Sequence, residues 1–186
     1  EDLALAEALL SSEDPPSVVR TLKSANPMEI RTGVGYDIHR LEAGSPLVLG
    51  GVEIPHTHGL VGHSDGDALA HAICDALLGA AGLGDIGTLF PDTDPKFRNA
   101  DSIDLLVQVV QQVARDHTIL SVDSTVKAES PRIGPHAQAM RERLAEALGI
   151  GADRVNVKAK TGEGVGPVGK KEAMETEAVA TLWRRA

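Results

Sequence analysis

The chain has 186 residues, of which 42% are hydrophobic and 24% are charged, values typical of a globular protein with a substantial core. Its formal net charge of −9 argues against a general binder of nucleic acid or of membrane surfaces, whose contact surfaces are basic. The single cysteine, Cys74, excludes an internal disulfide and fits a reducing compartment, and we expect it to be a small buried helix residue. No apolar run reaches the about 20 residues that cross a bilayer.

The first 27 residues differ in character from the rest. "EDLALAEALL" is typical of a short amphipathic helix, and the Ser- and Pro-rich sequence after it is typical of a linker. We therefore expect residues 1–27 to be the tail of a preceding domain plus a linker, and residues 28–186 to form one domain.

Strand and helix patterns alternate from residue 28 onward. In chain order we expect a strand at 28–41, a hairpin at 45–55 that turns at Gly50-Gly51, a helix at 65–81 that stops at Gly82, a loop at 84–97, a helix at 101–116, a strand at 118–128, a helix from Pro135 to Gly149, a strand at 154–161 and a last strand at 172–183. This order predicts an α+β fold, a two-layer domain whose mixed sheet is covered by helices.

Two histidines and a carboxylate stand out from this pattern. The period of two in a strand puts Asp37 and His39 on the same face. In "HSDGDALAHA", Ser64 is a good N-cap residue and Asp67 completes a capping-box-like pattern, but capping does not explain His71 inside the helix. Two imidazoles and one carboxylate are the three-ligand set of a catalytic zinc site. A sequence cannot show that the three converge, so unrelated surface or core positions remain the alternative.

Three loop segments carry further polar groups. The Asp-rich loop 84–95 is most simply a solvated turn. Segment 129–140 puts backbone N–H groups and Arg132 ahead of a helix, an arrangement that suits an anion. The Gly-rich turn 158–166 contains Glu163, whose carboxylate is a suitable ligand for a hard divalent cation.

Together these segments resemble a known enzyme family. "GVGYDIHRL" at 33–41, the block at 59–95 and "NVKAKTGEG" at 156–164 closely resemble 2-C-methyl-D-erythritol 2,4-cyclodiphosphate synthase. The resemblance implies that 4-diphosphocytidyl-2-C-methyl-D-erythritol 2-phosphate cyclises with release of CMP, a step of non-mevalonate isoprenoid precursor biosynthesis. It also implies a homotrimer with each active site between neighbouring subunits. The first ten residues resemble the end of a methylerythritol cytidylyltransferase, which implies a fused bifunctional enzyme.

The same resemblance assigns roles to individual residues. Asp37, His39 and His71 would bind zinc or another divalent metal, and Glu163 would bind Mg²⁺ or Mn²⁺ that bridges the substrate phosphates. His63 and Thr161 would hydrogen-bond the phosphates in the transition state. The residues implied to touch substrate are Asp37, His39, Ser64, Asp85, Ile86, Gly87, Phe90, Asp92, Asp94, Ala128, Pro131, Arg132, Ile133, Gly134, Lys160, Thr161, Gly162, Glu163, Pro167 and Lys170.

One segment departs from the family pattern. Many members have an aromatic residue and an arginine where this chain has Pro167 and Lys170, which puts binding of isoprenoid diphosphates in a trimer cavity in doubt.

Two other functions stay open: a zinc-dependent phosphohydrolase, in which water attacks, and a non-catalytic nucleotide-binding domain of a fusion protein. For the synthase, we expect a bacterial cytoplasmic location and no nucleic-acid or membrane partner.

Overall fold

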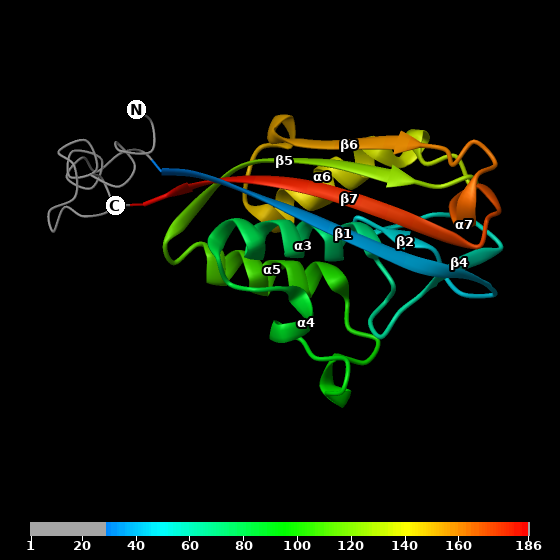
Figure 1. The fold of residues 1–186 in the computed structure, drawn as a ribbon, viewed down its shortest axis with the longest axis horizontal. Coiled ribbons are helices and arrows are strands. Elements are labelled where there is room, and N and C mark those ends of the chain that lie inside the picture. The colour runs from blue at the N-terminus through cyan, green and yellow to red at the C-terminus, as the bar shows by residue number, and fades with distance from the viewer. Residues whose placement is uncertain (1–28, 186) are drawn as a thin grey trace, which may run out of the picture. The chain divides into compact units, whose positions relative to one another are not determined.

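The structure, a computed structural model, describes residues 29–185 (Figure 1). The expected tail and linker at 1–27 lie outside the described residues. The strands are β1 (Glu29–Ala43), β2 (Val48–Leu49), β3 (Val52–Glu53), β4 (His58–Val61), β5 (His117–Lys127), β6 (Val155–Lys160) and β7 (Ala173–Arg184). The helices are α3 (Ala68–Ala81), α4 (Ile86–Leu89), α5 (Ser102–Val113), α6 (Ala137–Leu148) and α7 (Gly166–Gly169), with 3₁₀ turns η1 (Pro95–Phe97), η2 (Gly134–His136) and η3 (Ala152–Arg154).

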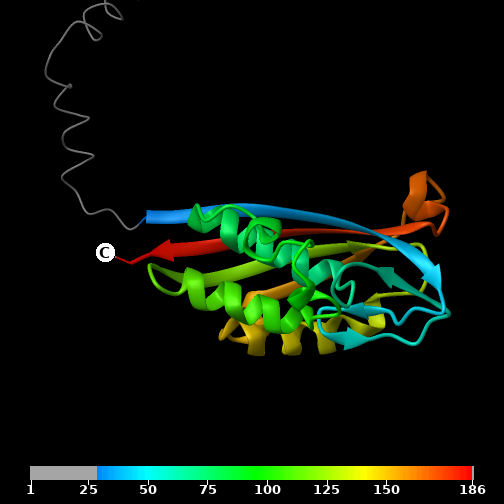
Figure 2. The ribbon, with the colours of Figure 1, turned by 90° about the horizontal axis from the view of Figure 1, so that it is seen from below.

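Five strands form one mixed sheet in the order β4-β1-β7-β5-β6. β5 runs parallel to β6 and antiparallel to β7, and β1 runs antiparallel to β4. Helices α3, α5 and α6 lie on one side of this sheet, which gives two layers (Figure 2). The α+β class, the mixed sheet and its helical cover are therefore confirmed.

The core between the layers is aliphatic. Leu69, Ile73 and Leu77 of α3 are fully buried, as are Leu106 of α5 and Leu144 of α6. Cys74 is buried in α3, as expected. Gly33 and Gly35 of β1, which have no side chain, let α3 approach the sheet closely.

The N-terminus of α3 corrects one expectation. Ser64 was expected to be the N-cap, but Asp67 takes that position, and its carboxylate accepts a hydrogen bond from the Ala70 N–H group. The same carboxylate accepts the N–H groups of Gly50 (2.9 Å) and Gly51 (2.7 Å), so the β2–β3 hairpin is tied to the start of the helix. The helix therefore begins at Ala68 rather than at 65.

Other boundaries differ in detail. The expected loop 84–97 contains α4 and η1, because Asp85 caps α4 and Asp94 caps η1. The strand β4, only four residues long, was not expected at all. The hairpin turn at Gly50-Gly51 is confirmed, and both residues have positive φ, 56° and 70°. The strand expected at 172–183 is confirmed as β7.

On the other face of the sheet, the short helix α7 stands at one end, and the rest of that face has no helix over it among residues 29–185 (Figure 2). Exposure alternates along β1, so every second side chain points to this face. The exposed large apolar side chains of β1 and β7 are Ile30, Val34, Tyr36, Ile38, Val179 and Trp183. In the same part of the chain, no helix has the length and apolar character that a membrane crossing requires.

Candidate metal centre and two pockets

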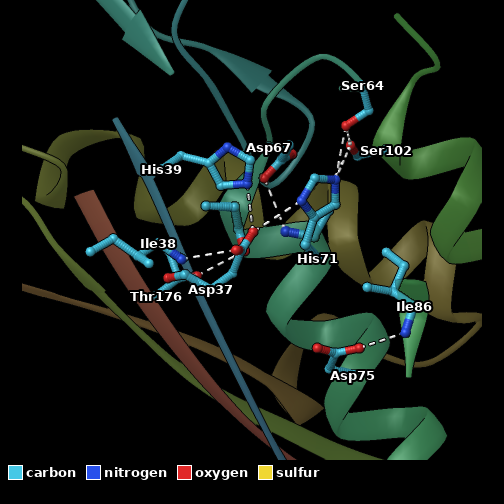
Figure 3. A network of polar contacts seen from close by, with 12 residues as sticks. Asp37, Ile38, His39, Ser64, Asp67, His71, Asp75, Ile86, Ser102 and Thr176 are labelled. Atoms are coloured by element: carbon cyan, nitrogen blue, oxygen red, sulfur yellow. Dashed lines mark hydrogen bonds and ion pairs between the residues drawn. The ribbon is translucent and has the colours of Figure 1, made fainter. Parts of the chain in front are cut away.

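Asp37 and His39 of β1 meet His71 of α3 where the helix crosses the strand. One ligand atom from each residue lies within 4.8 Å of the other two. Asp37 Oδ2 is 2.8 Å from His39 Nε2 and 3.0 Å from His71 Nδ1. Figure 3 shows the carboxylate between the two rings. The structure thus brings together the three residues that the sequence nominated.

The hydrogen bond on the outer nitrogen of His39 indicates that this cluster suits a cation. His39 Nδ1 lies 2.7 Å from the Val61 carbonyl oxygen, which only accepts, so Nδ1 carries a proton. In neutral His39 the Nε2 lone pair then faces the Asp37 carboxylate, and two acceptors in contact need a positive charge between them. The donor set of two imidazoles and one carboxylate fits a divalent metal such as zinc and leaves a fourth position open.

The pKa shifts of Asp37 and His39 also indicate that this cluster suits a cation. Burial alone would raise the pKa of Asp37, but the hydrogen bonds with His39 and His71 outweigh it and hold that pKa well below its usual range. Burial also works against charged His39, yet the hydrogen bond and charge of Asp37 raise the pKa of this imidazole. Both shifts favour positive charge beside the Asp37 carboxylate.

The Asp37–His39–His71 cluster opens into a pocket of about 360 Å³. Its lining includes these residues: Asp37, His39, His63, Ser64, His71, Ile86, Gly87, Phe90, Asp92, Phe97 and Leu105. The Nε2 atom of His63 is buried and has no hydrogen-bond partner among the described residues. A ligand that accepts or donates a hydrogen bond can therefore be held there.

Asp75, one turn after His71 on α3, fixes one wall of this pocket. Its Oδ1 accepts the Ile86 N–H group at 2.7 Å, where α4 begins (Figure 3). Burial raises the pKa of the Asp75 carboxyl. The carboxylates of Asp85 and Asp94 accept backbone N–H groups as caps and do not line the pocket.

A second and larger pocket, about 660 Å³, lies where β5 and β6 end. It is lined by Ala128, Glu129, Pro131, Arg132, Ile133, Gly134, Pro135, Ala159, Lys160, Thr161 and Glu163. Glu129, which the sequence did not nominate, accepts the Gly162 N–H group at 3.0 Å and so holds the turn after β6. In that turn Thr161 donates to the Glu163 carboxylate, and Glu163 has a positive φ of 50°.

The two pockets share no lining residue within this chain. Glu163 therefore lies apart from the Asp37–His39–His71 cluster, in the pocket with Lys160. Pro167 lies in α7 and Lys170 is its C-cap, and neither residue lines either of these two pockets. Ser102 was not among the predicted site residues, and its hydroxyl is 2.9 Å from His71 Nε2. No local sequence signal marks it, because the contact spans 31 residues.

Comparison with known proteins matches this chain to one family and to named enzymes. The model of the YgbB family matches residues 30–183. A curated relative from Bordetella petrii, named 2-C-methyl-D-erythritol 2,4-cyclodiphosphate synthase, is 57% identical over 83% of this chain and 96% of its own length. The bifunctional enzyme IspD/IspF of Albidiferax ferrireducens is 53% identical over 98% of this chain, which spans only 45% of that relative.

Solved structures give the same picture. The bifunctional IspDF of Campylobacter jejuni matches with a TM-score of 0.82 and 44% identity, over 89% of this chain and 46% of that one. A 2C-methyl-D-erythritol-2,4-cyclodiphosphate synthase in a form bound to CDP matches with a TM-score of 0.75 and 42% identity, over 82% of this chain and 99% of that one.

Proposed function

The chain belongs to the YgbB family, and on that premise we propose that it converts 4-diphosphocytidyl-2-C-methyl-D-erythritol 2-phosphate to 2-C-methyl-D-erythritol 2,4-cyclodiphosphate and CMP. This would make it a phosphorus–oxygen lyase of isoprenoid precursor biosynthesis. The observation that carries the proposal is the Asp37–His39–His71 cluster in a pocket beside His63.

The residues that would hold cations follow from the donor atoms. Asp37, His39 and His71 would hold zinc, and the Glu163 carboxylate would hold Mg²⁺ or Mn²⁺, which prefer oxygen ligands. When bound, these cations supply charge neutralisation and polarisation of phosphate oxygens.

The substrate supplies its own nucleophile, so the chain's residues position and stabilise. An oxygen of the 2-phosphate forms a bond to the β-phosphorus, the bond from that phosphorus to the oxygen shared with the α-phosphate breaks, and CMP leaves with that oxygen. His63, whose Nε2 has no partner among the described residues, and Thr161 would hydrogen-bond the phosphates as charge moves.

The two pockets suit the two ends of the substrate. The methylerythritol unit would lie against Ser64 and the 85–94 segment, of which Ile86, Gly87, Phe90 and Asp92 line the smaller pocket. Cytosine and ribose would occupy the larger pocket, where residues 128–134 and Lys160 offer backbone groups and a cation. The CDP-bound relative supports a cytidine nucleotide as ligand.

We propose a homotrimer in which the larger pocket of one copy faces the smaller pocket of the next. Two features support this: the pockets are separate within one chain, and an apolar sheet face lies uncovered among the described residues. Val34 on this face is 72% exposed. Val34→Asp should therefore give monomers in sedimentation experiments that keep zinc and lose turnover, and a fully active monomer would exclude the shared site.

Three further parts of the proposal concern the chain's context. Residues 1–27 would join the domain that begins at 28 to a cytidylyltransferase, as the bifunctional relative suggests. The bacterial relatives are named as biosynthetic enzymes, which supports a cytoplasmic location. Lys170 keeps a positive charge but lacks the bidentate geometry of arginine, so we expect weak binding of isoprenoid diphosphates.

Release of CMP separates this proposal from a binding module without catalysis. Chromatography of the purified chain with the substrate, Zn²⁺ and Mg²⁺ should show CMP formed over many turnovers. Stoichiometric binding of the substrate without CMP would favour the nucleotide-binding alternative. A phosphohydrolase would also release CMP, so its phosphorus product must be identified separately.

A further inference from the structure

The second ring nitrogen of His71 has a partner with a fixed direction. His71 Nε2 is 2.9 Å from Ser102 Oγ and 2.9 Å from Ser64 Oγ, on the side of the ring away from Asp37 (Figure 3). A neutral imidazole has one N–H donor and one lone-pair acceptor. Only a ring with its proton on Nε2 presents a free Nδ1 lone pair toward Asp37 and His39.

The hydroxyl proton of Ser102 is already used. Ser102 Oγ donates to Asp65 Oδ1 at 2.5 Å, and the Ser102 N–H group lies 3.1 Å from Asp65 Oδ2. A carboxylate can only accept, so both bonds point from serine to aspartate. Ser102 Oγ therefore turns its lone pair to His71 and accepts the Nε2 proton.

The surroundings keep this geometry in place. Ser102 is completely buried as the first residue of α5, so no solvent competes for its hydroxyl. Asp65 is held in the preceding loop, because its N–H group donates to the Ala100 carbonyl oxygen at 3.1 Å and its Oδ1 accepts the Asp67 N–H group at 3.1 Å.

Ser64 differs from Ser102 in two ways. It is only partly buried and lines the smaller pocket, and its hydroxyl bonds to His71 and Ser102 but to no carboxylate among residues 29–185. Its Oγ lies 3.1 Å from Ser102 Oγ, and because the Ser102 proton goes to Asp65, Ser64 is the donor in this contact. Ser64 is thus free to turn toward a ligand, whereas Ser102 is not.

We propose that Asp65 and Ser102 are positioning residues that hold the His71 ring with Nε2 protonated and Nδ1 directed at the metal position. His39 has the equivalent arrangement, since its Nδ1 proton goes to the Val61 carbonyl oxygen. Each histidine thereby has an outer acceptor that fixes its orientation. Loss of an outer partner of this kind typically weakens metal binding by about ten- to hundredfold. This inference rests on the proposed metal site.

Zinc affinity, measured by chelator competition on the full chain, tests the pair. Ser102→Ala removes the acceptor. Asp65→Asn keeps the size but can place an amide N–H group against Ser102 Oγ, which frees the serine proton to point at His71 Nε2. Both variants should bind zinc roughly ten- to hundredfold more weakly than the wild type. Ser64→Ala, the matched control, should change the affinity less than either.

Two additional measurements separate positioning from a general loss of folding. Thermal unfolding of chelator-treated protein should change little in Asp65→Asn, while the stabilisation gained on adding zinc falls. In zinc-loaded wild type and Ser64→Ala, the His71 Nε2 proton should give a slowly exchanging NMR signal, and Ser102→Ala should lose it. Wild-type affinity in both Ser102→Ala and Asp65→Asn would overturn the inference, and a wild-type chain that binds no zinc would overturn the proposed function with it.

Discussion

Gly35 of β1 lies directly against the backbone of Ala72 on α3, so closely that a Cβ atom on Gly35 would overlap the Ala72 carbonyl oxygen. Gly33, two residues earlier, meets the same helix at the Ala76 carbonyl oxygen in the same way. This close approach places Asp37 and His39 of β1 within reach of His71, one residue before Ala72.

Gly35→Ala should therefore damage both stability and the metal centre. Overpacking of this kind costs about 1–3 kcal/mol of the free energy of unfolding, measured by urea denaturation. Separation of β1 from α3 should also lower zinc content. Gly79→Ala is the control, because Gly79 lies in α3 with open space around its Cβ position. This substitution should raise the free energy of unfolding by up to about 1 kcal/mol. Equal zinc content in both variants would contradict the account.

His71→Ala should remove zinc and turnover while α3 stays folded, because alanine is the better helix former. We expect zinc to fall from about one equivalent per chain to a small fraction of that. Elemental analysis and circular dichroism measure the two effects. His58→Ala, at an exposed position of β4, should keep both zinc and helix content. Full zinc occupancy in His71→Ala would show that His71 is not a ligand.

Asp75→Ala should raise KM, because Ile86 loses the acceptor that anchors the pocket wall. One such hydrogen bond is worth about 1 kcal/mol, or roughly a fivefold change in affinity. Asp75→Asn keeps the carbonyl oxygen and should stay close to the wild type in steady-state kinetics. If asparagine behaves as alanine does, the negative charge matters rather than the hydrogen bond.

Glu163→Gln should spare zinc and slow turnover, since Glu163 lies in the other pocket from His71. Loss of about 3 kcal/mol of transition-state stabilisation would lower kcat roughly a hundredfold. Titration with Mg²⁺ at saturating zinc measures this effect. Unchanged turnover at limiting Mg²⁺ would remove Glu163 from the proposed cation site.

The sequence predicted the parts of the site that depend on local periodicity. Asp37 and His39 share a face because strands repeat every two residues, and this was confirmed by the structure. The prediction of Ser64 as the N-cap of α3 was wrong. Asp67 takes this position, and its carboxylate also binds the hairpin glycines 50 and 51, which only tertiary folding brings close to it.

Contacts between distant segments could not be predicted. Ser102 reaches His71 only after α5 packs beside α3, and nothing within "DSIDLL" indicates a partner 31 residues away. Strand β4 has four residues without an alternating pattern, and it becomes a strand by pairing with residues 40–43 of β1. Tertiary pairing rather than local propensity decides such elements.

The most direct test of the proposed function is phosphorus NMR of the product formed by the purified chain with its proposed substrate, Zn²⁺ and Mg²⁺. The account predicts CMP together with the paired signals of a cyclic diphosphate, because the substrate's own phosphate is the nucleophile. CMP together with a linear bisphosphate would mean that water attacks instead, and the chain would then be a phosphohydrolase.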